Sequence, residues 1–200
     1  MEEYPMSVIG KHGVSTTTPE NILLGAGTYL KNLKWDTQSK MWTGTVIGAT
    51  NGGGKISIAG EVVPIEVDGA LVKIKGMAVK QGGTVTAEVN FAELSAEVLK
   101  MGTLFETGTS DADGFTMLQD KANIQEDDYV EGFGFVGYTL NNAKQIIVIM
   151  ENALCTSGLE LEPKHKEQTV VKLTMEAYAN NEGNLDTLPV KIYYPDSPMV

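Results

Sequence analysis

A glycine-rich run that ends in a lysine, residues 51–55, has the composition of a phosphate-binding loop. Such a loop needs a further glycine five residues before the one that precedes the lysine, and a serine or threonine after the lysine. Ala49 and Ile56 occupy those two positions, and the residues that follow alternate like a strand. We therefore predict a flexible loop that binds no nucleotide or other cofactor. Its residues are Asn51, Gly52, Gly53 and Gly54.

Clustered acids between residues 111 and 120 are the second feature that could bind a ligand. Asp111, Asp113, Gly114 and Asp120 follow part of the pattern of a calcium-binding loop. An EF-hand also needs a glycine after its third ligand, a bidentate glutamate at its end and a helix on each side. The segment fits none of these requirements, so we predict a solvated acidic loop and no metal site.

The single cysteine offers neither a disulfide nor an evident nucleophile. Cys155 is ten residues from His165, and His12 is the only other histidine. A catalytic cysteine needs a base beside it and a third group that orients the base. One cysteine and two histidines are also too few ligands for a structural zinc ion. We predict an inert, buried cysteine and a protein that is not an enzyme.

The charge composition argues against a protein that reads nucleic-acid sequence. The chain has a formal net charge of −11, and all 15 of its basic residues are lysines. Base readout and phosphate clamping depend on arginine and on basic patches. Residues 1–5 do not resemble a signal peptide, and the longest apolar run, residues 145–150, is too short for a membrane span. We expect a soluble protein made in a cytoplasm.

Alternating apolar and polar residues predict a protein made mainly of strands. The alternation is clearest in residues 84–91 and 168–179, where every second side chain forms an apolar face. Further extended segments are expected at 27–35, 41–47, 132–139, 144–153 and 190–194. A short helix is expected from Ser95, a capping residue, to about Met101, with Gly102 after its last turn.

A two-residue turn predicts a hairpin near the middle of the chain. Asp68 and Gly69 separate extended runs at 55–67 and 70–80. An Asp-Gly pair between two such runs favours a type I′ turn, which needs positive φ at both residues. We therefore expect two strands joined directly at Asp68 and Gly69.

The chain is expected to form one folded domain behind an arm. Residues 1–20 show little periodicity and are interpreted as an N-terminal arm. For residues 21–200 we predict a single, mainly β domain, an antiparallel β-sandwich or barrel with one short flanking helix. The length of the chain suits one domain with a sizeable core.

Several segments, taken in order, carry a likeness to a known family. They are NILLGAGTY at 21–29, GATNGG at 48–53, IEVDGA at 65–70 with Lys75 and Gly76, NFAEL at 90–94, ENAL at 151–154, LEL at 159–161 and IYYP at 192–195. In this order and spacing they resemble the tail tube proteins (major tail proteins) of long-tailed phages or prophages of Gram-positive bacteria.

The resemblance implies a function as well as a tail-tube-like β-sandwich fold. In that family six copies make a ring, and stacked rings form a tube through which double-stranded DNA is ejected. The implied partners are further copies of the chain and other tail proteins, such as the tape measure and the tail terminator. DNA would pass only transiently and without specificity, and no membrane is involved. The implied location is the tail of the virion, after assembly in the host cytoplasm.

An acidic channel would let DNA slide, because it repels the phosphates. The strands around the predicted hairpin offer three candidate lumen acids, Glu61, Glu66 and Glu88, while Asp68 and Gly69 form the candidate assembly hairpin. The alternative function is a monomeric β-sandwich binding module, such as a carbohydrate-binding or virion-decoration domain. A binding module would present a concave or aromatic face, whereas a tube protein would form rings or long polymers.

Overall fold

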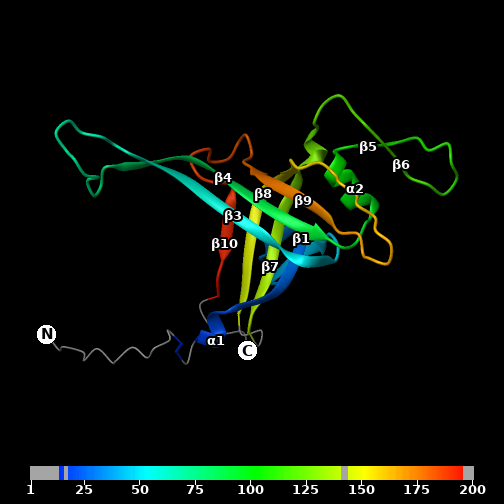
Figure 1. Ribbon diagram of the computed structural model, residues 1–200, viewed down its shortest axis with the longest axis horizontal. Coiled ribbons are helices and arrows are strands. Elements are labelled where there is room, and N and C mark those ends of the chain that lie inside the picture. The colour runs from blue at the N-terminus through cyan, green and yellow to red at the C-terminus, as the bar shows by residue number, and fades with distance from the viewer. Residues whose placement is uncertain (1–13, 16–17, 141–143, 196–200) are drawn as a thin grey trace.

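Strands dominate the computed structural model, which describes residues 14–15, 18–140 and 144–195 (Figure 1). The main sheet contains β1 (Leu23–Asp36), β2 (Met41–Val46), β3 (Thr50–Pro64), β4 (Ala78–Phe91), β7 (Val130–Thr139), β8 (Gln145–Cys155), β9 (Val171–Tyr178) and β10 (Val190–Tyr193). The remaining elements are α1 (Thr18–Asn21), α2 (Ala96–Thr103), β5 (Glu106–Gly108), β6 (Met117–Gln119) and the 3₁₀ helix η1 (Glu126–Asp128). Most of the predicted arm, residues 1–20, lies outside the described residues.

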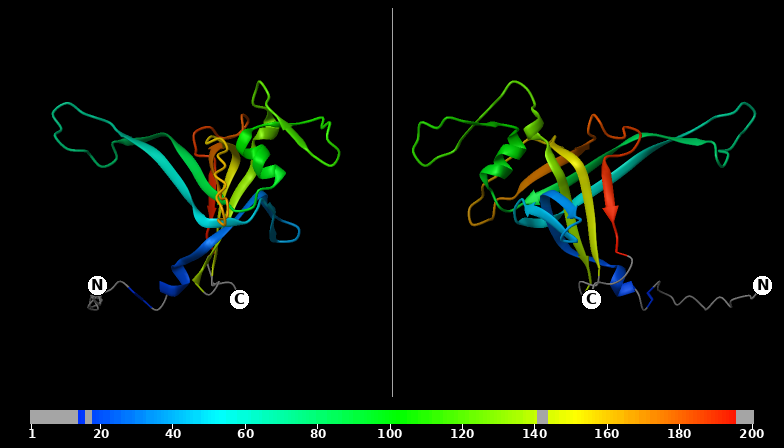
Figure 2. Two further views of the ribbon diagram at one scale, coloured as in Figure 1. Left: turned by 45° about the vertical axis from the view of Figure 1, so that its right-hand side comes forward. Right: turned by 180° about the vertical axis from the view of Figure 1, so that it is seen from behind.

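One curled antiparallel sheet of eight strands organises the molecule (Figures 1 and 2). Its order is β2-β1-β7-β8-β9-β4-β3. One edge of β8 pairs with β7, and two strands share its other edge. Residues 147–150 pair with β10 there, and residues 152–155 pair with β9. The prediction of a mainly β, sandwich- or barrel-like fold with one short flanking helix is confirmed.

The core is built from the apolar faces that the alternation predicts. In residues 85–91 of β4 and 171–175 of β9, every second side chain is 1% exposed or less. These residues are Val85, Ala87, Val89, Phe91, Val171, Leu173 and Met175. The two strands pair directly, so their buried side chains form one continuous surface. Tyr29 of β1, Phe133 of β7 and Met150 of β8 complete the cluster against it.

Helix α2 begins as predicted and ends later than predicted. The Ser95 hydroxyl accepts a 3.2 Å hydrogen bond from the Val98 amide, which is the expected N-cap. The helix then continues through Gly102 and ends at Leu104, which has a φ of 59°. Gly102 serves packing rather than termination, because a Cβ there would lie only 2.9 Å from the Leu173 side chain.

The glycine-rich segment lies in a strand, so the prediction of a loop at Asn51, Gly52, Gly53 and Gly54 is wrong. β3 begins at Thr50, which faces Phe91 of β4, but Gly54 already faces Val89. Two additional residues of β3 therefore bulge out of the pairing. Gly52 and Gly53 have φ values of 80° and 72°, which glycine adopts without strain.

Gly54 differs from Gly52 and Gly53, because close packing and not a positive φ requires a glycine there. A Cβ at this position would overlap the Tyr29 hydroxyl and would lie 2.6 Å from the Glu88 carbonyl oxygen. Tyr29 belongs to β1, so Gly54 lets strands from distant parts of the curled sheet approach one another.

Replacing Gly54 by alanine should lower the free energy of unfolding by about 1–3 kcal/mol, the usual cost of forcing atoms into a filled site. Gly48→Ala is the matched control, because a Cβ there would make an ordinary 3.5 Å contact with Glu93. Urea unfolding of both variants and the wild type measures the difference. Equal stability of the two variants would show that β3 moves away from Tyr29 without cost.

Candidate assembly surface

The outer halves of β3 and β4 form a hairpin that projects from the body of the molecule (Figures 1 and 2). We call residues 60–83 the projecting hairpin. β4 pairs with β9 only over residues 86–91, so in the projecting hairpin its one partner among the described residues is β3. Within the described residues no third strand pairs with this part of the ladder.

The connection at the tip of the hairpin is longer than the predicted two-residue turn. Pairing ends at Pro64 and Ala78, so the prediction of a strand over residues 70–80 is wrong for its first part. Asp68 and Gly69 do form a turn, closed by a 3.1 Å hydrogen bond from the Ala70 amide to the Val67 carbonyl. Of the two turn residues only Gly69 has positive φ, at 86°, so the turn is not of type I′.

Apolar side chains of the projecting hairpin lie in solvent. Leu71 is 99% exposed and Val72 is 76% exposed, and none of residues 60–83 is buried. The other exposed large apolar residues of the hairpin are Val62, Ile65, Val67, Ile74 and Val79. Isolated apolar residues are normal on a protein surface, but a contiguous group on one element marks an interaction surface. Its free strand edges also favour pairing with another chain.

The three candidate lumen acids occupy different settings. Glu88 lies on the outer face of β4, with its Oε2 2.6 Å from Lys172 Nζ and its Oε1 3.6 Å from Lys55 Nζ. Lys55 is the register partner of Glu88, and Glu61 lies in β3 between Gly60 and Val62, where the register with β4 shifts. Glu66 lies in the connection after β3, so its predicted strand position is wrong. Two lysines therefore compensate the charge of Glu88.

The pairing of Glu88 predicts how its carboxyl group titrates. The hydrogen bond and charge of Lys172, followed by the charge of Lys55, hold the pKa of Glu88 below its ordinary value. This pair therefore stabilises the fold above the unfolded-state pKa, and the contribution is lost as pH falls through the folded-state pKa. Lys172→Met should raise the pKa of Glu88, measured by NMR titration, more than Lys55→Met does. An unchanged pKa in Lys172→Met would contradict the pairing.

A second exposed surface is aromatic. Trp35 and Trp42 face each other in the β1–β2 pairing with ring centroids 5.3 Å apart, and Trp42 contacts Tyr193 of β10 at 4.7 Å. Trp35 is 46% exposed and Tyr193 is 41% exposed. We call these three residues the aromatic row. Sequence reasoning missed it because the curl of the sheet, which local patterns do not reveal, brings Tyr193 to the two tryptophans.

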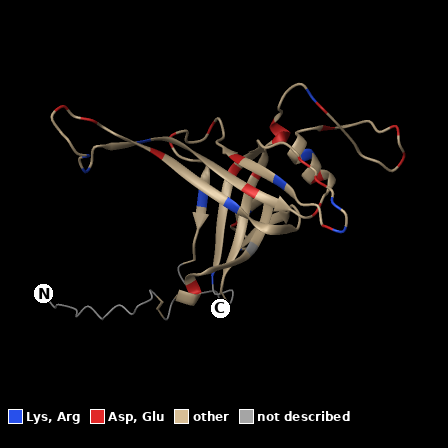
Figure 3. Ribbon diagram, viewed as in Figure 1, with Lys and Arg blue, Asp and Glu red and all other residues tan. Residues whose placement is uncertain are grey.

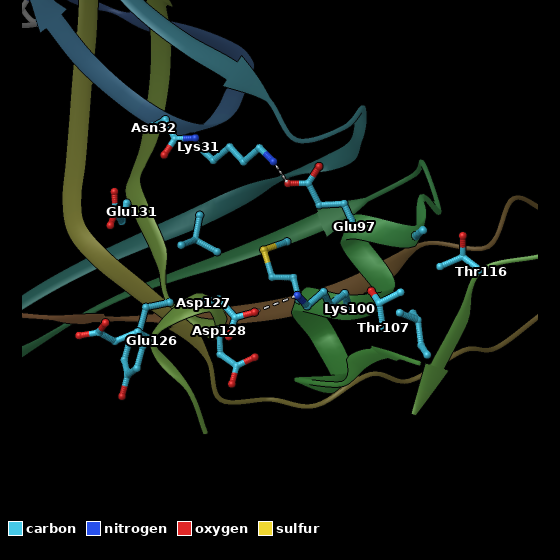
Figure 4. Close-up of a pocket in the computed structure, with 15 residues that line it drawn as sticks. Lys31, Asn32, Glu97, Lys100, Thr107, Thr116, Glu126, Asp127, Asp128 and Glu131 are labelled. Carbon is cyan, nitrogen blue, oxygen red and sulfur yellow. Dashed lines mark hydrogen bonds and ion pairs between the residues drawn. The ribbon is translucent and has the colours of Figure 1, made fainter. Parts of the chain in front are cut away.

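A cavity of about 490 Å³ lies between α2, η1 and the β5–β6 hairpin (Figure 4). Lys31 forms an ion pair with Glu97 across its mouth, and Lys100 pairs with Asp127 at 3.2 Å. Glu126 and Glu131 also line the cavity but form no ion pair within the described part of the chain. With these two carboxylates, which we call the rim acids, the residues that line the cavity carry an excess of negative charge.

A buried ion pair fixes one wall of the cavity. Lys121 Nζ lies 2.6 Å from Asp128 Oδ1, and the two side chains are only 6% and 1% exposed. The other carboxylate oxygen of Asp128 accepts a 2.7 Å hydrogen bond from the Gln125 amide, which caps η1. The hydrogen bond to Asp128 raises the pKa of Lys121, although burial opposes the shift. Because each buried charge has its partner, removing one alone would destabilise this wall strongly.

The other residues singled out in the sequence lie apart from one another where the structure describes them, and His12 lies outside the described residues. Cys155 is buried at 3% exposure, as predicted, and His165 lies in an exposed turn. The acids at Asp111, Asp113 and Asp120 are exposed, and no group of three or more potential ligands is placed to hold a metal ion within the described residues. No helix in the described ranges is long and apolar enough to cross a membrane.

Comparison with known proteins identifies no family for this chain, so a function must be inferred from its sequence and structure. No protein-family model matches the chain, and no curated protein matches it.

Proposed function

We propose that the chain is a structural virion protein that assembles into stacked hexameric rings and forms a phage tail tube, a conduit for double-stranded DNA. The observation that carries the proposal is the projecting hairpin, with Leu71 99% exposed and no buried residue. An apolar element that a monomer leaves uncovered gains stability when another chain covers it. The ring of six and the stacking are inferred from the resemblance of residues 21–195 to tail tube proteins.

The proposed partners follow from the same function. Copies of the chain bind one another within and between rings, and the ends of the tube meet other tail proteins, such as the tape measure and the tail terminator. The tube lies in the tail of the virion after assembly in the host cytoplasm, and DNA passes through it without sequence-specific contacts.

The charge of the chain supports passage of DNA without retention. The net charge is −11 and the chain contains no arginine. Acidic residues occur in the projecting hairpin, in the main sheet and around α2 (Figure 3). A lumen lined by such residues would repel phosphates. Of the candidate lumen acids, Glu61 would contribute more to this field than Glu88, because Lys172 and Lys55 compensate Glu88.

Leu71→Glu should block assembly and leave the monomer stable, because the Leu71 side chain is 99% exposed among the described residues. We expect the critical concentration for polymer formation to rise about tenfold or more, which corresponds to at least ~1.4 kcal/mol per contact. Leu185→Glu is the matched control, since Leu185 is 70% exposed and lies between β9 and β10. Sedimentation velocity and negative-stain microscopy measure the polymer, and urea unfolding measures stability.

The outcomes of this experiment distinguish a wrong assembly contact from a wrong function. Normal tubes from the Leu71→Glu variant would remove the hairpin from the assembly contact. A wild-type protein that stays monomeric at the highest attainable concentration would overturn the proposed function itself.

The aromatic row favours a second candidate function, a monomeric binding module that recognises carbohydrate. Trp35 and Tyr193 are both partly exposed, and the ring of each contacts Trp42. Such rings offer an apolar face on which a sugar can stack.

Trp35→Ala should abolish carbohydrate binding if the second function holds, because it removes an exposed ring of the row. The measurement is the change in tryptophan fluorescence when soluble oligosaccharides are added to the monomeric protein. Phe115→Ala is the matched control, since Phe115 is a 75% exposed aromatic residue far from the row in sequence. A wild-type protein that responds to none of the oligosaccharides would argue for the tube.

A further inference from the structure

We infer that the cavity between α2, η1 and the β5–β6 hairpin receives the tip of the projecting hairpin, residues 65–77, from a second copy of the chain. The inference rests on the proposed function and names the surface that the hairpin meets. The projecting hairpin and two of the elements that line the cavity, α2 and the β5–β6 hairpin, lie on opposite sides of the molecule (Figures 1 and 2). A hairpin therefore cannot reach the cavity of its own chain, and the contact joins two copies.

The cavity offers the apolar surface that the tip lacks. Met101, Leu118 and Val130 form apolar parts of its wall, and its volume of about 490 Å³ is in the range of binding cavities. Leu71 and Val72 are the two most exposed large apolar side chains of the described chain. Entry of the tip would cover both of them and the apolar wall in one contact.

Charge complementarity orients the lysine side of the tip toward the acids of the cavity. The lysines of the cavity are already engaged, Lys31 with Glu97 and Lys100 with Asp127, while Glu126 and Glu131 have no ion pair within the described residues. On the tip, Lys73 directly follows Val72 and Lys75 lies two residues further on, whereas the acids of the tip, Glu66 and Asp68, precede Leu71; all four are exposed and none has an ion pair within the described residues. The unpaired acids of the rim thus match the unpaired lysines beside the apolar residues of the tip.

The contact explains why assembly would continue beyond a dimer. A hairpin at one end that enters a cavity at the other end is a heterologous, head-to-tail interface. Each bound copy still presents a free hairpin or a free cavity, so addition continues until the rotation between copies closes a ring or a filament extends. Pairing of two hairpins with each other would instead be symmetric and would stop at two copies.

Charge reversal tests the contact without disturbing the fold, because Glu126, Glu131, Lys73 and Lys75 are all exposed. The cavity variant is Glu126→Lys with Glu131→Lys, and the tip variant is Lys73→Glu with Lys75→Glu. Each variant alone places like charges against each other, and we expect its critical concentration to rise about tenfold or more. An equimolar mixture should assemble near the wild-type concentration, because every tip then meets a cavity of opposite charge.

A second pair of reversals controls for net charge. Glu160→Lys with Asp186→Lys makes the same change of charge as the cavity variant at exposed sites outside the cavity, and it should assemble like the wild type. Light scattering and negative-stain microscopy measure the three variants, the mixture and the wild type. Normal assembly of the cavity variant, or a mixture that fails to assemble, would overturn the inference. In either case the proposed function stands if Leu71→Glu still blocks tubes that the wild type forms.

Discussion

The pairing of β3 with β4 is the interaction on which the rest of the structure depends, because a single ladder serves both the core and the projecting hairpin. Its inner half buries Val85, Ala87, Val89 and Phe91 in the centre of the protein. The register slips between Gly60 and Val62, where a Cβ at Gly83 would overlap the Ala59 carbonyl oxygen. The glycines let the ladder bend away from the curled sheet at that point. The well-packed inner half of the ladder can therefore support a projecting hairpin that contains no buried residue.

Local sequence patterns predict the strands well and the glycines poorly. Alternation in residues 84–91 and 168–179 identifies the strands that form the core, since each pattern reports which face is buried. A glycine-rich run reads as flexible, yet Gly54 is fixed by a side chain of β1 that is 25 residues away. Likewise the sequence around Gly102 predicts a helix end, although contact with Leu173 of β9 sets the role of this glycine. The conformational freedom of glycine is visible in a sequence, but the neighbour that requires it is not.

The candidate site could not be predicted, because its parts meet only in the folded chain. The cavity combines Lys31 of β1 with α2 and with the residues around η1, and a chain with 26 acidic residues permits too many ion pairs to choose among them. The alternation around Asp68 and Gly69 resembled that of half-buried strands. Only the sheet order shows that nothing among the described residues covers this segment. Exposure of an apolar run is a property of topology, which single-residue patterns do not report.

A net charge of −11 and an exposed apolar hairpin act over different distances, and this difference would govern assembly. Repulsion between two acidic copies extends over roughly the Debye length, about 10 Å at 0.1 M salt, whereas the apolar contact forms only once the surfaces meet. Free copies would therefore stay apart at low salt and low concentration despite their uncovered side chains. Rim acids that meet tip lysines would replace repulsion by attraction at the one approach that buries the hairpin. The same net charge would then disfavour every other orientation of two copies.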